Sequence, residues 1–127
     1  MHPPPKQKKI AVVDDDPSIL NNTVSALRRA GHDVRAYDNA ETAVEPIEQF
    51  RPDIVITDVN LPGRDGISLA SGLREKLPDC RIVLYSGTLL PLVVTFARHG
   101  GYELLQKPLE EEQLLALIAR PAPLVSK

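Results

Sequence analysis

The chain has 127 residues, of which 43% are apolar and 25% are charged, as expected of one ordinary soluble domain with a single core. Its formal charge is −2, its pI is near 5.9, and no predicted helix carries a Lys/Arg stripe, which argues against direct nucleic-acid binding. No stretch approaches the roughly 20 apolar residues of a membrane span, and the start lacks the apolar core of a signal peptide. We therefore expect no membrane insertion.

Cysteine and histidine give no sign of a metal or redox centre. Cys80 is the single cysteine, so no internal disulfide can form. We interpret Cys80 as a small apolar filler beside a strand and expect a reducing cytoplasm. His2, His32 and His99 are scattered without metal-ligand spacing, and we interpret them as surface or cap residues.

Short β-branched runs alternate with helical patterns along the chain. Proline-rich ends at residues 1–8 and 120–127 are typical of a linker or disordered lead-in and a tail, which leaves residues 9–119 as the predicted domain. The β-branched runs predict five strands, three of them strongly apolar as in parallel strands covered on both faces. These strands are expected at residues 10–13, 34–37, 54–57, 81–85 and 103–106.

The first two helices carry recognisable start signals. Asp16 can cap the first helix, with Pro17 at its first position and Gly31 beyond its end. Asp38 and Glu41 resemble a capping box for the second helix, which Pro46 should kink or shorten. The expected core positions of the two helices are Leu20, Val24, Leu27, Ala40, Ala43, Val44, Ile47 and Phe50.

The other helices differ in their apolar patterns. The third and fifth carry clear stripes, at Leu69, Ala70, Leu73 and Leu77, and at Leu114, Leu117 and Ile118. Three glutamates, Glu110, Glu111 and Glu112, complement the dipole at the start of the fifth. Residues 88–97 are more apolar than an exposed fourth helix needs. They predict either a short, tightly packed helix started at Pro91 or a dimer or partner surface together with residues 103–106.

Strand and helix alternate five times, and right-handed crossovers then give an α/β fold. We predict a doubly wound, five-stranded parallel sheet of flavodoxin-like order 2-1-3-4-5 with five helices. In that order, ligands bind beyond the carboxyl ends of the first and third strands, where the strand order reverses.

Acidic residues stand at that point. Asp14 and Asp15 follow the first strand, and Asp58 follows the third, whereas Asp16 is interpreted as a helix cap. Carboxylates that meet at one edge repel each other unless protons or a cation offset the charge. Mg²⁺ suits such a cluster because it takes oxygen ligands and usually needs only one or two carboxylates.

A hydroxyl and a cation should face the acids. Ser86 follows the fourth strand and Lys107 follows the fifth. A phosphoryl group on a carboxylate between the two edges would have a metal ion on one side and these donors on the other. That arrangement neutralises the charge that phosphoryl transfer must stabilise.

Five sequence blocks flank the predicted site. They are Val12-Val13-Asp14-Asp15, residues 52–58, Leu61-Pro62-Gly63 with Asp65-Gly66, Leu84-Tyr85-Ser86-Gly87, and Lys107-Pro108. Together these blocks resemble the receiver domain of two-component response regulators, from about residue 9 to residue 119. Any one block alone would be weak, whereas the set is specific.

The resemblance implies a role for each acid. Asp58 matches the phosphoacceptor, which takes a phosphoryl group from a sensor histidine kinase or a histidine phosphotransfer protein. Asp15 and Asp58 match metal ligands for Mg²⁺, with Mn²⁺ as a possible substitute. Asn60 matches the position whose backbone carbonyl completes the metal site, and Asp14 matches the acid that acts through a metal-bound water.

The resemblance also implies a switch. Ser86 and Lys107 match the residues that move to the phosphoryl group, and the bond before Pro108 matches one that is cis in the family. The family often has an aromatic switch residue where this chain has Leu104, and Tyr102 lies two residues too early. The expected output is altered affinity for a partner through the face of the fourth strand, fourth helix and fifth strand, with an effector or a second copy binding at the fourth helix and fifth strand.

Other functional interpretations fit the sequence less well. A phosphatase of the haloacid-dehalogenase type needs a second Asp where this chain has Asn60, which cannot shuttle a proton. A flavin or nucleotide module needs a Gly/Ser/Thr loop after the first strand, where three acids stand. A receiver used only for docking is disfavoured by the complete set of acids, hydroxyl and lysine. We expect no enzymatic activity beyond self-phosphorylation and self-dephosphorylation. The chain could be a stand-alone receiver, a hybrid-kinase receiver or an excised fragment.

Overall fold

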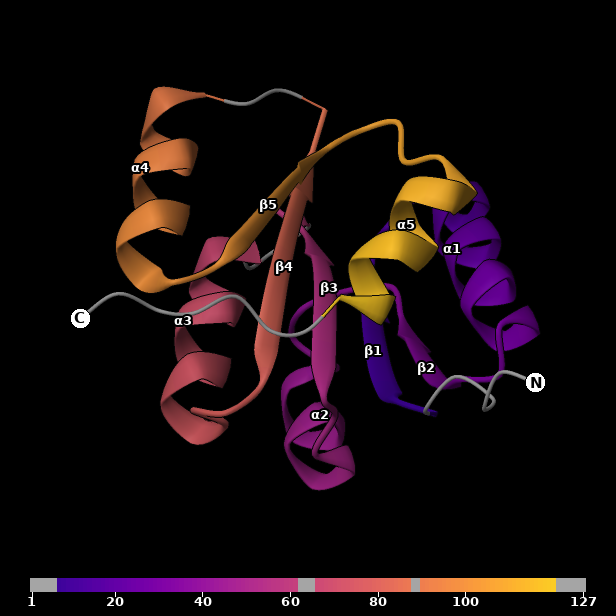
Figure 1. Cartoon of the computed structure of the whole chain (residues 1–127). Helices are drawn as coiled ribbons and strands as arrows, with labels where there is room; N and C mark the ends of the chain where they lie inside the picture. Colours follow the sequence, from indigo (N-terminus) through magenta and orange to yellow (C-terminus); the bar gives the residue numbers. More distant parts are fainter. Residues whose placement is uncertain (1–6, 62–65, 88–89, 121–127) are drawn as a thin grey trace.

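The computed structural model describes residues 7–61, 66–87 and 90–120 (Figure 1). Five parallel strands form one sheet in the order β2-β1-β3-β4-β5, so the predicted α/β fold and strand order are confirmed. The strands are β1 Lys9–Val13, β2 Asp33–Tyr37, β3 Ile54–Asp58, β4 Arg81–Ser86 and β5 Glu103–Gln106. The helices are α1 Pro17–Arg29, α2 Val44–Phe50, α3 Gly66–Lys76, α4 Pro91–Gly100 and α5 Glu111–Ala119.

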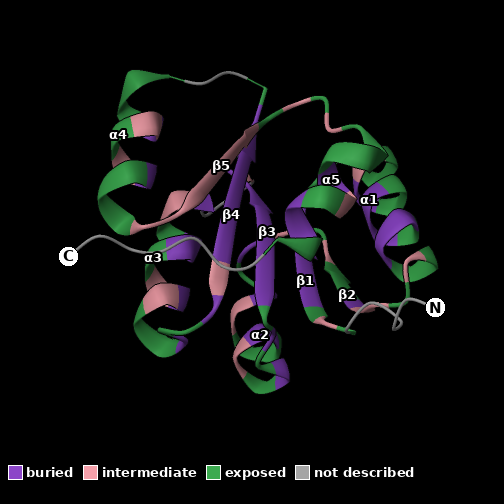
Figure 2. Ribbon diagram, in the orientation of Figure 1, coloured by how far each residue is buried: buried purple, intermediate pink, exposed green. Residues whose placement is uncertain are grey.

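The sheet is the middle of three layers. Because side chains alternate along a strand, Val12 and Ile56 pack with α1 and α5, while Ala11 and Val55 pack with α2, α3 and α4. Figure 2 shows the result, with buried central strands and helices that are exposed on their outer sides. The two apolar clusters hold the strands in one register, and this register sets where the strand ends lie.

Helix α1 begins as predicted. The carboxylate of Asp16 accepts hydrogen bonds from the N–H groups of Ser18 at 2.9 Å and Ile19 at 3.2 Å, and Pro17 is the first helical residue. Both donors would otherwise lack a partner inside the helix. The cap fixes the direction in which the chain leaves Asp14 and Asp15, the two residues that follow β1.

The predicted start of the second helix is wrong. Helix α2 begins at Val44, not near Asp38, and its cap residue Ala43 offers no side-chain hydrogen bond. Asn39 takes the local role instead, because its side-chain oxygen accepts the N–H of Thr42 at 2.9 Å and forms a turn. Pro46 is the third residue of α2, where its missing N–H would have had no partner inside the helix, so the proline is tolerated there.

Helix α4 does begin at Pro91, but its first turn is not tightly packed. Val93 and Ala97 are buried, whereas Leu90 is 56% exposed and Leu92 is 84% exposed. The expectation of a fully packed helix is therefore wrong at this end, and Thr88 and Leu89 lie outside the described residues.

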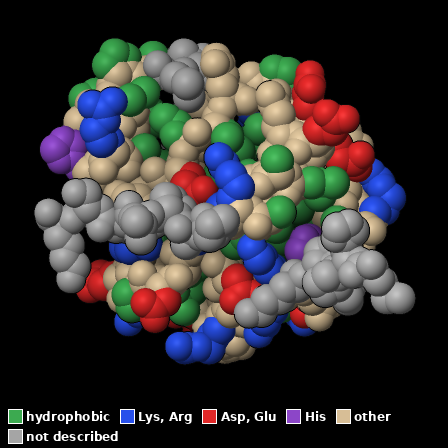
Figure 3. All heavy atoms as spheres, viewed as in Figure 1, with side chains coloured by type: hydrophobic (Ala, Val, Ile, Leu, Met, Phe, Trp, Pro, Cys, Tyr) green, Lys and Arg blue, Asp and Glu red, His purple; other side chains and the backbone are tan. Residues whose placement is uncertain are grey.

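The start of α5, the chain ends and the expected absence of a membrane span complete the comparison with the predicted elements. Acidic side chains gather over the start of α5 (Figure 3), where Glu111 and Glu112 occupy the first turn as predicted. Most of the expected lead-in and tail, His2 and the loop residues Pro62, Gly63 and Asp65 lie outside the described residues. Within the part of the chain that the structure describes, no helix combines the length and apolar character needed to cross a bilayer.

Candidate functional site

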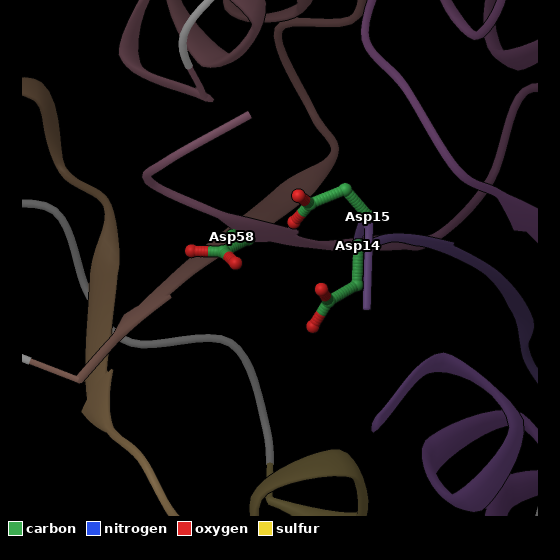
Figure 4. A group of neighbouring side chains, drawn as sticks. All are labelled: Asp14, Asp15 and Asp58. Atoms are coloured by element: carbon green, nitrogen blue, oxygen red, sulfur yellow. The ribbon is translucent and has the colours of Figure 1, made fainter. Parts of the chain in front are cut away.

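Three carboxylates converge at the carboxyl ends of β1 and β3. Asp14 and Asp15 follow β1, Asp58 is the last residue of β3, and one oxygen from each lies within 4.8 Å of the others. Figure 4 shows the side chains of Asp14 and Asp15 pointing toward the side on which Asp58 lies. Asp14 and Asp58 are 0% and 6% exposed, whereas Asp15 is exposed. The cluster therefore combines buried negative charge with one solvent-facing acid.

Lys107 supplies the positive charge of the site. Its Nζ lies 2.8 Å from Oδ2 of Asp58 and 3.3 Å from Oδ2 of Asp14. Burial by itself would lower the pKa of Lys107, but the hydrogen bond to Asp58 and the charge of Asp14 outweigh it, so the pKa lies above its ordinary value. One ammonium group thus partly offsets two carboxylates, and a net negative charge remains.

Backbone donors orient both buried carboxylates. The N–H of Asp16 donates to Oδ1 of Asp14 at 2.8 Å, and the N–H of Asn60 donates to Oδ1 of Asp58 at 3.0 Å. In each carboxylate the second oxygen, Oδ2, turns to Lys107. These bonds come from the turns that follow the two strands, so the strand ends themselves fix the direction of the acids.

Tyr85 is a member of the site that the sequence did not reveal. It is buried on the α1–α5 side of β4, and its hydroxyl donates to Oδ2 of Asp14. Its ring centroid lies 4.7 Å from Nζ of Lys107. Burial raises the pKa of Tyr85, and the hydrogen bond to Asp14 adds to this, so the hydroxyl remains a donor. An aromatic residue in an apolar strand gives no sign of such a polar contact.

The predicted hydroxyl and lysine lie at neighbouring strand ends. Ser86 is the last residue of β4 and is 2% exposed, and its carbonyl accepts the N–H of Lys107 at 2.8 Å. The peptide bond between Lys107 and Pro108 is cis. Strands β4 and β5 therefore bring the backbone of Ser86 and the side chain of Lys107 to the edge that holds the acids.

The expected aromatic switch position holds a different contact. Leu104 is half-buried against the core on the α4 side. Tyr102, two residues earlier on the same side, stacks on Phe96 of α4 with ring centroids 4.8 Å apart. The aromatic contact with α4 thus comes from the residue just before β5, whereas Lys107 follows the other end of this strand.

The donor set fits a hard divalent cation. Carboxylate oxygens from three residues surround one point, and Mg²⁺ prefers such ligands together with water and phosphate oxygens. The described residues offer no His or Cys in this group, which disfavours a site built for softer metals.

A family model for the response regulator receiver domain matches residues 10–119. The chain belongs to this family. This receiver domain is 35% identical over 112 residues to the DNA-binding transcriptional regulator NtrC of Azospirillum brasilense, covering 87% of the chain and 23% of NtrC. It thus spans about a quarter of the length of the curated relatives that it matches.

Solved structures agree with the family assignment. A CheY-like response regulator receiver domain protein from Methanospirillum hungatei JF-1 has a TM-score of 0.85 at 25% identity, covering 89% of this receiver domain and 91% of that chain. A response regulator protein from Burkholderia pseudomallei, solved with a phosphorylated aspartic acid, a calcium ion and citrate, has a TM-score of 0.80 at 27% identity. That match covers 87% of this receiver domain and 65% of that chain.

Proposed function

We propose that this receiver domain is a signalling switch that accepts a phosphoryl group on Asp58. The observation that carries the proposal is the contact between Asp58 and Lys107 beside two further carboxylates. A carboxylate with a cation at one oxygen and further acids nearby that could hold a metal ion suits attack on phosphorus. A phosphorylated aspartic acid in the related Burkholderia pseudomallei protein supports this role.

Transfer to Asp58 exchanges one bond to phosphorus for another. One carboxylate oxygen of Asp58 attacks the phosphorus of a phosphohistidine on a sensor kinase or phosphotransfer protein. A phosphorus–oxygen bond forms as the phosphorus–nitrogen bond breaks, and the electron pair stays on the imidazole nitrogen, which takes a proton from solvent. In hydrolysis, water attacks the phosphorus, the bond between phosphorus and the Asp58 oxygen breaks, and inorganic phosphate leaves the regenerated carboxylate. The domain thus catalyses only its own modification, in the cytoplasm where such kinases act.

Mg²⁺ would be held by the acids. The ligands in this proposal are Asp15, Asp58 and the backbone carbonyl of Asn60, with Asp14 acting through a water molecule. The ion supplies positive charge that offsets the phosphoryl oxygens, and Mn²⁺, which also takes oxygen ligands, is a possible substitute. Lys107 and Ser86 bind the phosphoryl group from the side opposite the metal.

The output is a change in partner affinity. When Ser86 and Lys107 turn toward the phosphoryl group, the ends of β4 and β5 shift, and helix α4 packs against β5. Two arrangements of this face then differ in their affinity for an effector or a second copy of the chain. The exposed Leu90 and Leu92, at the start of α4, would contact such a partner.

The test is labelling by acetyl phosphate. The wild type should gain a phosphoryl group when Mg²⁺ is present, and the label should disappear with a chelator or in Asp58→Asn. Asp79→Asn is the matched control, because Asp79 is an exposed acid before β4, at the other end of the sheet. Labelling that survives in Asp58→Asn, or is absent from the wild type, would refute the proposal.

A further inference from the structure

Tyr85 links three members of the site. Its hydroxyl donates to Asp14, its ring faces the ammonium group of Lys107 at 4.7 Å, and its carbonyl accepts the N–H of Val59, the residue after Asp58, at 3.1 Å. The side chain is 1% exposed and packs in the cluster between the sheet and helices α1 and α5. The ring is therefore held in place by packing that does not depend on the site.

The carboxylate of Asp14 has a small set of partners among the described residues. Its Oδ1 accepts the N–H of Asp16, and its Oδ2 accepts from Tyr85 and Lys107. Asp14 is fully buried, so bulk water does not take the place of a hydrogen-bond partner that it loses. A buried carboxylate that loses its cation loses both a hydrogen bond and the compensating positive charge.

Two groups compete for the ammonium group of Lys107. Before transfer it is shared between Asp14 and Asp58. After transfer, a phosphoryl group on Asp58 brings oxygens that attract the ammonium group more strongly than one carboxylate does. Among the described residues, the hydroxyl of Tyr85 is then the protein donor that remains at Oδ2 of Asp14.

We propose that Tyr85 is a positioning residue for phosphorylation, whose hydroxyl keeps Asp14 compensated and aligned when Lys107 turns from Asp14 to the phosphoryl group. This inference rests on the proposed function of Asp58. Tyr85 also directly precedes Ser86 in β4. The same short segment therefore holds Asp14 with one residue and presents the hydroxyl of the next to the phosphoryl group.

The test is Tyr85→Phe, which removes one oxygen and keeps the packed ring. We expect the rate of labelling by acetyl phosphate to fall about tenfold or more, as for the loss of one hydrogen bond to a charged group. Tyr102→Phe is the matched control, because Tyr102 stacks on Phe96 away from the acids, and its rate should stay that of the wild type. Circular dichroism establishes that each variant is folded.

A double-mutant cycle separates positioning from a structural effect. In an Asp14→Asn background there is no buried charge at this position to compensate, so adding Tyr85→Phe should change the labelling rate less than about twofold. The same four proteins are unfolded in urea without metal, where the loss caused by Tyr85→Phe should also shrink in the Asp14→Asn background. This second measurement decides the question even if Asp14→Asn is labelled too slowly to follow.

The outcomes are distinct. If Tyr85→Phe is labelled like the wild type, or loses equally in both backgrounds by both measurements, the role of Tyr85 is refuted and the proposed function stands. If the wild type is not labelled, or Asp58→Asn is, the proposed function itself fails. A loss of about tenfold or more that depends on Asp14 supports the inference.

Discussion

Gly66 lies against the backbone of Asp58. A Cβ built on Gly66 would stand 1.9 Å from the carbonyl oxygen of Asp58 and 3.0 Å from the Cα of Val59. The N–H of Gly66 donates to the carbonyl of Val59 at 2.8 Å. Helix α3 therefore starts directly beside the strand end that carries the candidate phosphoacceptor, and only hydrogen fits at this position.

Replacing Gly66 by Ala should disturb both stability and the site. The added methyl group meets backbone that cannot rotate away, so β3 and α3 must separate, and we expect a loss of about 1 to 3 kcal/mol in the free energy of unfolding. Labelling of Asp58 should slow as well, because its backbone moves. Urea unfolding and acetyl phosphate labelling measure the two effects. Gly87→Ala is the stability control, since a Cβ there meets nothing within 4 Å; equal stability of both variants would contradict the packing argument.

Divalent cations should stabilise the folded chain through the acid cluster. Mg²⁺ offsets repulsion between carboxylates that the unfolded chain does not hold together, so a concentration about 100 times the Kd should add about 2.7 kcal/mol. Thermal unfolding with increasing Mg²⁺ measures this gain. Asp15→Asn should remove most of it. Asp16→Asn is the matched control, because Asp16 caps α1 and Asn caps equally well. A shift of the same size in Asp15→Asn would place the ion elsewhere.

The ion pair between Arg81 and Glu103 should contribute far more to stability than the one between Arg29 and Glu111. The first pair has side chains 9% and 15% exposed, whereas those of the second are 66% and 51% exposed. Arg81 also donates to the carbonyl of Leu117 at 3.0 Å, which ties α5 to the sheet.

Arg81→Met should therefore cost about 3 kcal/mol, because it leaves a poorly solvated Glu103 unpaired. Arg29→Met should cost less than about 1 kcal/mol, as for other exposed pairs. Urea unfolding of both variants provides the comparison. Similar losses in the two would show that burial does not set the strength of these pairs.

Cys80 should be unreactive in the folded protein. The residue is 5% exposed, and burial raises the pKa of its thiol from 9.0 to about 12. Because the thiolate is the reactive form, a thiol reagent should label the folded chain only at a rate limited by unfolding, even near about pH 9. Addition of urea should restore fast labelling. Rapid labelling of the folded chain at neutral pH would contradict the burial of Cys80.

Much of the fold follows from local patterns and one topological rule. The five β-branched runs and the cap at Asp16 predict the right elements, and the strand order places Asp14, Asp15 and Asp58 at one edge. The prediction of where α2 starts was wrong because Asp38 and Asn39 are both good turn formers. The sequence does not show which of the two side chains will bond to the backbone.

The role of Tyr85 could not be predicted for a different reason. Tyr85 stands on β4 and Asp14 follows β1, with β3 between them, so their contact depends on sheet twist and on the reach of a side chain. The close approach of Gly66 to Asp58 is likewise set by how α3 packs. Such distances come from tertiary structure, which residue patterns do not encode locally.

Asp58 is the side chain on which we expect the phosphoryl group. The most direct measurement is peptide mapping by mass spectrometry after incubation with acetyl phosphate and Mg²⁺. We predict one phosphoryl group per chain, on the peptide that carries Asp58 and on that residue. A phosphoryl group found on Asp14, Asp15 or any residue outside the acid cluster would contradict the account.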